Sequence, residues 1–248
     1  MNHELLKSII YDQHEVIRNA DIVSRPSYTF EANANYVLVG LRRAGKSTLL
    51  YKIVRNLIAG GVSWDQIIYI NFEDERLSEF RKEDLNDILS VQSELSSAQG
   101  YFFFDEIQIV PGWEKFCRRM ADARERVYVT GSNASMLSRE IATTLGGRYL
   151  TKYVTPYNFD EYLTALDIPH DSRALYQTKA NGRIRSHCAD YLQYGGFPEA
   201  LRYTARREYI SSVYQKILLG DIIARNGIRN DYAIRILMKK LAESVKSE

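Results

Sequence analysis

Residues 40–47, Gly-Leu-Arg-Arg-Ala-Gly-Lys-Ser, constrain the fold of this chain more than any other stretch. They fit the pattern G-x-x-x-x-G-K-[ST] at every specified position. The apolar run at residues 36–39 predicts a buried strand before the motif, and residues 48–54 continue after it with the apolar spacing of a helix. A strand, a glycine-rich loop and a helix in this order indicate a phosphate-binding loop, because a chance glycine-rich turn would lack these flanks.

The residue types of this loop suit a polyphosphate. Glycines let the backbone fold around an anion with its N–H groups pointing inward, and the next helix directs its positive end at the same point. Lys46 supplies a positive charge for the outer phosphates, and the Ser47 hydroxyl is a ligand for magnesium. We therefore predict that the chain binds a nucleoside triphosphate, by default ATP, together with Mg²⁺. The predicted nucleotide-binding residues are Gly40, Arg42, Arg43, Ala44, Gly45, Lys46, Ser47 and Thr48.

A second motif follows about 60 residues after the loop. The aromatic residues 101–104 predict a strand buried on both faces, and Asp105 and Glu106 stand at its carboxyl end. In a phosphate-loop protein this is the Walker B position, where an aspartate binds magnesium directly or through its water shell. We predict that Asp105 is a metal ligand with Ser47, and that Glu106 accepts a proton from an attacking water. A helix N-cap at Asp105 is the structural alternative.

Two acidic residues also follow the predicted strand 67–72. Ligands of open α/β sheets bind at the carboxyl ends of the strands, so Glu73 or Asp74 could contact the magnesium shell or a substrate. A solvated acidic turn is the alternative, and the composition of the segment favours it.

The predicted strand 127–130 ends in small polar residues at the same edge of the sheet. Asn133 is the preferred candidate for positioning the attacking water or contacting the terminal phosphate. Ser132 suits a cap for a helix at residues 134–145 as well as it suits a catalytic role.

Arg148 lies at a predicted turn between a helix and the strand 149–154. An arginine at such a turn could meet the γ-phosphate bound by a neighbouring subunit and stabilise charge in the transition state. This catalytic role would require a homo-oligomer. A plain structural arginine is the alternative, and the sequence leaves both open.

The composition excludes several classes of protein. The 248 residues include 33 basic and 31 acidic side chains, and a net charge of +2 is no overall signature of nucleic-acid binding. Cys117 and Cys188 have no C-x-x-C spacing, so we expect neither a disulfide framework nor structural zinc. A reducing cytoplasm is the compartment that we expect for such a chain. Acidic residues interrupt the apolar residues of the N-terminus, so we expect no signal peptide. A membrane helix needs about 18 consecutive apolar residues and no stretch is that long, so we expect no membrane association.

Several ordered segments together resemble the prokaryotic AAA-type ATPases called AAA family 14. They are residues 40–50 (Gly-Leu-Arg-Arg-Ala-Gly-Lys-Ser-Thr-Leu-Leu), 103–108 (Phe-Phe-Asp-Glu-Ile-Gln), 130–134 (Thr-Gly-Ser-Asn-Ala) and 146–149 (Gly-Gly-Arg-Tyr). The resemblance implies an α/β fold, a P-loop NTPase of the AAA+-like type, with a parallel five-stranded sheet in the order 5-1-4-3-2 flanked by helices. It also implies the roles given above for Lys46, Ser47, Asp105, Glu106 and Asn133.

The resemblance continues through residues 155–163 to residues 194–199 (Tyr-Gly-Gly-Phe-Pro-Glu). The latter segment is similar to the start of the DUF4143 region that follows this ATPase core. Proteins of this kind normally run well past residue 248, so we expect a truncated C-terminal region and an unknown protein partner.

We expect three parts: an N-terminal helix and lead-in at 1–30, the ATPase core at 31–155, and a helical lid at 156–248. The predicted helices are 3–19, 46–58, 82–97, 113–124, 159–166, 198–206 and 207–225, and a further helical segment is expected at 232–241. Asn158, with Glu161 three residues later, predicts a capping box for the helix 159–166. Residues 201–248 carry ten Lys or Arg against five Asp or Glu, which favours a solvated basic face over a surface for nucleic acid. Arg225 or Arg229 could instead cover the phosphates as a lid arginine.

The leading hypothesis is a magnesium-dependent ATPase in which Glu106 activates water. A nucleotide-dependent switch or scaffold, which binds ATP with negligible hydrolysis, is the alternative from another class. A small-molecule or nucleotide kinase is a third hypothesis, but the consecutive carboxylates of Asp105 and Glu106 favour water activation.

Overall fold

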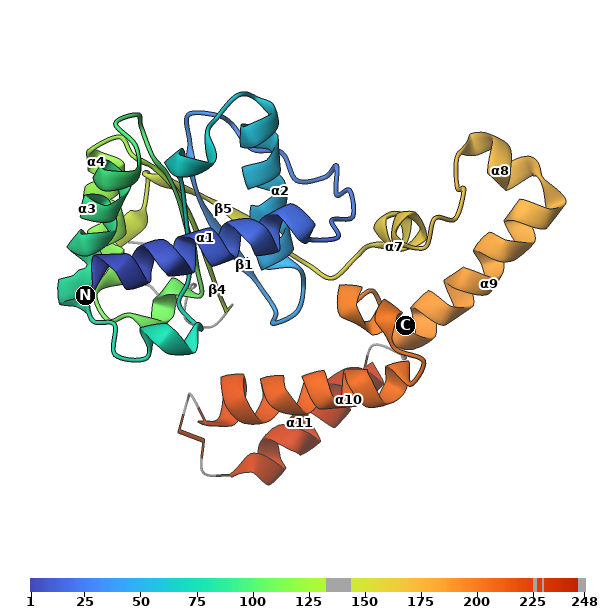
Figure 1. Cartoon of the computed structure of the whole chain (residues 1–248). Helices are drawn as coiled ribbons and strands as arrows, with labels where there is room; N and C mark the ends of the chain where they lie inside the picture. Colours follow the sequence, from blue (N-terminus) through green and yellow to red (C-terminus); the bar gives the residue numbers. More distant parts are fainter. Residues whose placement is uncertain (133–143, 225–226, 229, 245–248) are drawn as a thin grey trace. The chain divides into compact units, whose positions relative to one another are not determined.

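Five short strands form one parallel sheet in the computed structural model, with the order β2-β3-β4-β1-β5 (Figure 1). Read from the other edge, this is the strand order 5-1-4-3-2 that the family resemblance implies, so that prediction is confirmed. The strands are β1 (Asn35–Gly40), β2 (Ile67–Asn71), β3 (Tyr101–Asp105), β4 (Arg126–Ser132) and β5 (Tyr149–Tyr153).

The structure describes residues 1–132, 144–224, 227–228 and 230–244. The chain divides into two compact units, Met1–Pro198 and Glu199–Glu248. The predicted divisions at residues 30 and 155, and the role of the second half as a lid, stay predictions. In the described residues, no helix is long and apolar enough to cross a membrane.

Helices cover both faces of the sheet. Successive side chains of a strand point to opposite faces, so a continuously apolar strand is buried only when both faces are covered. The helices are α1 (His3–Asn19), α2 (Lys46–Ala59), α3 (Leu85–Leu95) and α4 (Trp113–Asp122). Phe102 and Phe104 are fully buried in the cluster formed with α1, α3 and α4, whereas Phe103 is fully buried in the cluster formed with α2. The strand predicted to be buried on both faces is therefore covered on both.

Five of the predicted helices agree with the structure to within a few residues: 3–19, 46–58, 82–97, 113–124 and 159–166. The helix expected at 134–145 lies almost wholly outside the described residues. The largest difference is at the start of α3, where Lys82–Asp84 form a 3-10 turn and the α-helix begins only at Leu85. The Asp84 carboxylate accepts a hydrogen bond from the Arg81 N–H at 2.8 Å, which closes this turn before the helix starts.

Gly40, the last residue of β1, lies directly against Val154, the residue after β5. A Cβ atom on this residue would lie 2.0 Å from the carbonyl oxygen of Val154, a contact that no side chain could make without moving the backbone. The Val154 N–H donates to the Val39 carbonyl at 2.7 Å and holds the two segments together. Glycine is therefore required at the point where the strand enters the phosphate-binding motif.

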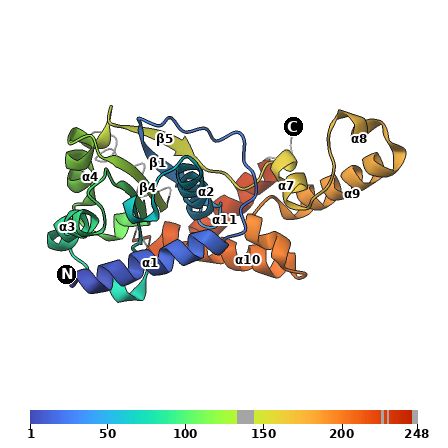
Figure 2. The same ribbon diagram turned by 45° about the horizontal axis from the view of Figure 1, so that its top comes forward.

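Beyond the sheet, α7 (Phe159–Ala165) begins with the predicted capping box. The Asn158 side chain accepts from the Glu161 N–H at 2.8 Å, and Glu161 accepts from the Asn158 N–H at 3.2 Å. The next helices, α8 (Ser172–Tyr176) and α9 (Thr178–Tyr194), pack against each other (Figure 2). The sequence does not predict α9, because Ile184 is its one buried residue and a mostly solvated helix has little apolar periodicity.

The second unit corrects two of the predicted helices. Residues 198–206 do not form one helix: a 3-10 turn covers Pro198–Arg202, and α10 starts at Arg206. Stacking of Tyr203 on Tyr209, with ring centroids 4.8 Å apart, turns the chain back onto α10. The predicted helix 207–225 is α-helical only to Lys216, and Ile217–Ala224 form a π-helix. A further helix, α11 (Asp231–Ser244), contains the predicted helical segment after residue 231.

His14 joins α1 to the sheet. Its side chain is 1% exposed, and its Nε2 atom lies 2.8 Å from the Ile67 carbonyl oxygen at the start of β2. The imidazole packs against Trp64 with centroids 4.9 Å apart, and its Nδ1 atom is buried without a hydrogen-bond partner. Burial lowers the pKa of His14, because the protonated ring would bring a second N–H into this site without an acceptor.

We predict that His14 makes the folded state less stable in mild acid. Because its pKa is lowered in the folded protein, its contribution to stability is complete above the unfolded pKa, about 6.5, and is lost as the pH falls from there toward the folded pKa. The free energy of unfolding, measured in urea at several pH values, should therefore fall less steeply toward pH 5 in His14→Gln, which does not titrate. An identical slope in both proteins would contradict the prediction.

Candidate functional site

The loop after β1 has the backbone shape expected of a phosphate-binding loop. β1 ends at Gly40, α2 begins at Lys46, and the predicted order of strand, loop and helix is confirmed. Gly45 immediately precedes the helix with φ at 95°, a left-handed conformation that glycine adopts without strain. Arg43 also has a positive φ, at 63°, which gives the loop a tight turn on either side of the buried Ala44.

Lys46 extends back from the first turn of α2 into the loop. Its Nζ atom donates to the carbonyl oxygens of Gly40 and Leu41, at 3.1 and 3.2 Å. The same atom lies 3.6 Å from Oε1 of Glu106. The structure therefore brings together the lysine of the first motif and the second carboxylate of the other, although they lie on different elements.

Asp105 is the last residue of β3 and is held from both neighbouring strands. Tyr69 of β2 donates its hydroxyl to Oδ2 at 2.8 Å, and Thr130 of β4 donates its hydroxyl to Oδ1. The carboxylate is 2% exposed, so these donors compensate for much of its lost hydration. Burial and the charge of Asp105 raise the pKa of Tyr69 well above 10, which keeps this phenol protonated as a donor.

Tyr69 and Thr130 are site residues that the sequence analysis misses. Each lies inside a predicted strand, where an aromatic or a β-branched residue needs no functional explanation. The available signal is weak: Thr130 is the one residue with an aliphatic hydroxyl in the segment 127–130, at the carboxyl end of the predicted strand.

Glu106 leaves the strand in a left-handed conformation, with φ at 53°. Its N–H donates to the Thr130 hydroxyl oxygen at 3.0 Å, and its Oε2 accepts from the Gln108 amide at 2.5 Å. Burial raises the pKa of Glu106 above the ordinary value of 4.5; the charge of Lys46 and the hydrogen bond from Gln108 oppose this rise, and the nearby negative charges add to it. This carboxylate is therefore a stronger base than an exposed one.

Asp105 and Ser47 are the predicted metal ligands, a buried carboxylate at the sheet edge and a partly exposed hydroxyl in the first turn of α2. Each Asp105 oxygen accepts one hydrogen bond and keeps further acceptor capacity. Such oxygen ligands suit Mg²⁺, which proteins often bind through one or two carboxylates together with substrate phosphates. Among the described residues no group of three or more His, Cys, Asp and Glu side chains could hold a metal by itself.

The acidic residues after β2 serve the local structure. Arg42 of the loop pairs with Glu73 at 3.1 Å. Asp74 caps the turn Glu75–Leu77 and pairs with Arg76 at 2.8 Å, which lowers the pKa of the Asp74 carboxyl. These contacts fit the solvated acidic turn better than a ligand role for Asp74.

Arg148 lies near the amino ends of the strands, whereas the loop lies at their carboxyl ends. It directly precedes β5, whose first residue pairs with Asn35 at the start of β1, about 16 Å along the strand from Gly40. Its Nε donates to Asp122 at 2.5 Å. The structure therefore does not bring Arg148 to the phosphate-binding loop of its own chain. Asn133, Arg225 and Arg229 lie outside the described residues.

A small cavity of about 20 Å³ adjoins the phosphate-binding loop. It opens beside Gly45 and Thr48, between the start of α2 and the lead-in before β1. The sequence analysis assigns no role to the lead-in or to Tyr157. The residues around the cavity are Ile22, Val23, Arg25, Gly45, Thr48, Leu49, Lys52, Tyr157 and Pro198.

Comparison with known proteins identifies the family. A family model described as an AAA domain, AAA_14, matches residues 32–163, which include β1 to β5 and most of α7. Protein MJ1544 of Methanocaldococcus jannaschii, named as uncharacterised, is 32% identical over 98% of this chain and 54% of its own length. An uncharacterised protein of Haemophilus influenzae is 30% identical over 84% of this chain and 51% of its own. The chain thus spans about half the length of these curated relatives.

Solved structures resemble the chain more distantly. The Saccharomyces cerevisiae Hsp104–ADP complex matches 98% of this chain and 39% of its own, with 13% identity and a TM-score of 0.46. DnaA of Aquifex aeolicus bound to AMPPCP matches 88% and 70%, with 14% identity and a TM-score of 0.37. At this level of similarity they carry no argument about what the chain does.

We predict that Thr130→Val lowers the free energy of unfolding by about 1–3 kcal/mol, because it leaves a buried carboxylate oxygen and the Glu106 N–H without their partner. Thr130→Ser is the matched control, since it keeps the hydroxyl and loses only a methyl group. Urea unfolding of the three proteins measures the difference. Equal stability of the valine and serine variants would show that the two hydrogen bonds contribute nothing net.

Proposed function

The chain belongs to the AAA_14 family of AAA domains, and we propose that it binds ATP with magnesium and hydrolyses it. The observation that carries the proposal is the 3.6 Å approach of Lys46 Nζ to Oε1 of Glu106 at the end of the loop. It supports one site in which a phosphate-binding cation and a buried carboxylate with a raised pKa serve the same substrate.

Each residue has a distinct part in the proposed reaction. The loop backbone and the start of α2 bind the phosphates, and Lys46 moves its charge from the loop carbonyls to the outer phosphates. Asp105 and Ser47 would hold Mg²⁺, which neutralises phosphate charge when it is bound. Glu106 takes the proton of the attacking water, and Gln108 orients its carboxylate.

The cavity beside Gly45 and Thr48 supports a place for the nucleoside. A volume of about 20 Å³ is too small for a purine base, so the surrounding side chains must move to admit one. The default to adenine rests on the family, because nothing around the cavity selects one base.

Hydrolysis is favoured over a switch that only binds ATP because Glu106 is poised as a base. Binding without turnover would need the loop and Lys46 but no buried carboxylate beside them. We further propose that, in the whole protein, hydrolysis is coupled to a conformational task that involves a DUF4143 region and an unknown protein partner. A role of residues 156–248 as a helical lid and a cytoplasmic location are further parts of the proposal.

We predict that Lys46→Ala loses ATP binding, whereas Glu106→Gln binds ATP and loses turnover by at least about 100-fold, as expected for removal of a general base. Fluorescent ATP analogues measure binding, and phosphate release from MgATP measures turnover. Lys115→Ala and Glu114→Gln on α4 are the charge-matched controls and should behave as wild type. Normal hydrolysis by Glu106→Gln would refute the assignment of the base.

The rate of hydrolysis should also depend on pH. Glu106 acts as a base only when it is deprotonated, and burial raises its pKa above 4.5. We expect kcat to fall as the pH decreases through this raised pKa, in the range where the protein stays folded. A kcat that is constant down to about pH 4.5 would contradict a buried base.

Arg148 is proposed to act in a neighbouring subunit of a homo-oligomer, since it lies far from the loop of its own chain. Specific activity should then rise with protein concentration, and mixing Lys46→Ala with Arg148→Ala should recover part of the activity that each variant lacks. Asp122→Asn, which removes the partner of Arg148, is the control for a merely structural effect. Full activity of Arg148→Ala would exclude the catalytic role.

A further inference from the structure

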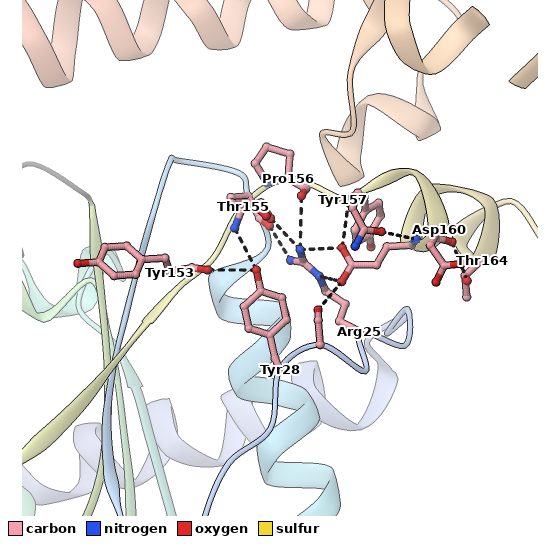
Figure 3. A network of polar contacts seen from close by, with 12 residues as sticks. Arg25, Tyr28, Tyr153, Thr155, Pro156, Tyr157, Asp160 and Thr164 are labelled. Atoms are coloured by element: carbon pink, nitrogen blue, oxygen red, sulfur yellow. Dashed lines mark hydrogen bonds and ion pairs between the residues drawn. The ribbon is translucent and has the colours of Figure 1, made fainter. Parts of the chain in front are cut away.

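Arg25 is a buried arginine in the lead-in before β1, and its side chain joins distant parts of the first unit (Figure 3). The residue is 4% exposed. Its Nε and Nη2 atoms donate to the two carboxylate oxygens of Glu161, at 3.0 and 2.9 Å. Glu161 is itself 2% exposed, so each charge depends on the other for compensation.

The remaining donors of the guanidinium reach two other segments. Nη2 donates to the Thr155 carbonyl at 2.8 Å, on the connection between β5 and α7. Nη1 donates to the Ala44 carbonyl at 3.2 Å, inside the phosphate-binding loop. The rings of Tyr28 and Tyr157 lie 4.7 and 5.2 Å from the guanidinium carbon and exclude water from it. One side chain therefore connects the lead-in, the loop and α7.

The contact with Ala44 has a consequence for phosphate binding. In a trans peptide the C=O and the following N–H point in opposite directions, so a donor on the Ala44 carbonyl turns the Gly45 N–H to the other side. The N–H groups of such a loop bind phosphate only when they point inward. Arg25 thus restrains one peptide plane of the loop, next to Gly45, which lacks a Cβ atom and therefore has more backbone freedom than other residues.

Glu161 links this restraint to α7. The same carboxylate that holds Arg25 accepts from the Asn158 N–H in the capping box, so its position depends on the first turn of that helix. A shift of α7 would move the carboxylate, release the guanidinium and free the Ala44–Gly45 peptide.

We propose that Arg25 is a positioning residue that orients the Ala44–Gly45 peptide for phosphate binding, and that the Arg25–Glu161 pair couples nucleotide binding to the position of α7. The inference rests on the proposed function, since it concerns the nucleotide site of that proposal. Coupling of this kind is reciprocal, so a bound nucleotide must also stabilise the start of α7.

A plain anchoring role for the ion pair makes a different prediction. An anchor would change the stability of the fold and leave the affinity for phosphate unaltered in any variant that still folds. Because Arg25 also lines the cavity beside the loop, direct contact with the nucleoside is a second alternative. Loss of such a contact would weaken the binding of nucleotides and leave the affinity for a simple polyphosphate unchanged.

The test uses Arg25→Met/Glu161→Gln in the full 248-residue chain, which avoids a buried unpaired charge and keeps an acceptor for the capping box. Arg55→Met is the matched control. Arg55 donates to the carbonyls of Ile17, Arg18 and Ala20. The substitution therefore removes comparable arginine–carbonyl hydrogen bonds at a place that does not contact the loop. Thermal unfolding checks that both variants fold cooperatively. Binding is measured with fluorescent mant-ADP and magnesium, and by its competition with tripolyphosphate.

We expect the double variant to bind mant-ADP and tripolyphosphate about tenfold or more weakly, by similar factors, because an oriented hydrogen bond to a charged group is lost. Arg55→Met should stay within about twofold of wild type. In wild type, MgADP should slow hydrogen exchange of the amides of residues 159–163, and this effect should be absent in the double variant.

Two results would overturn the inference while the proposed function stands. Affinities equal to those of Arg55→Met would reduce the pair to an anchor. Weaker binding of mant-ADP alone, with tripolyphosphate unaffected, would place the effect on the nucleoside. Failure of wild type to bind either probe would instead refute the proposed function, and this inference with it.

Discussion

Buried charge at the carboxyl edge of the sheet is the constraint on which the rest of this structure depends. Asp105 ends a strand that helices cover on both faces and Glu106 follows it, and neither residue is more than 9% exposed. A buried ion is costly without hydrogen bonds or an opposite charge. The neighbouring strands and the loop must therefore supply donors here, and Tyr69, Thr130 and Lys46 do so.

The same constraint acts a second time on the other side of the loop. Arg25 and Glu161 are buried as completely as the carboxylates, and the guanidinium uses its donors on three separate segments. Two charged clusters thus meet the phosphate-binding loop, one through Lys46 and one through the Ala44 carbonyl. Binding of a polyanion between them would change the electrostatic balance of both, which gives a physical route from the site to α7.

Much of the fold could be predicted from local patterns. The strand before the loop, the aromatic strand and the capping box at Asn158 each depend on residues close together in sequence, and each is confirmed. The errors occur where the local pattern is interrupted or weak. The segment predicted as one helix at 198–206 divides into a 3-10 turn and the start of α10, with Tyr203 stacked on Tyr209. The solvated α9 has too few apolar positions to be recognised.

The phosphate-binding loop and the strand that ends in two carboxylates can be found in the sequence alone, and the family resemblance adds the order of the strands. Which side chains pair with the buried charges is set only by the tertiary structure. Glu161 stands 136 positions after Arg25, and Thr130 stands 25 after the carboxylate that it supports. Spacing in sequence carries no information about such pairs, because the packing of the sheet and its helices sets the distances between their atoms.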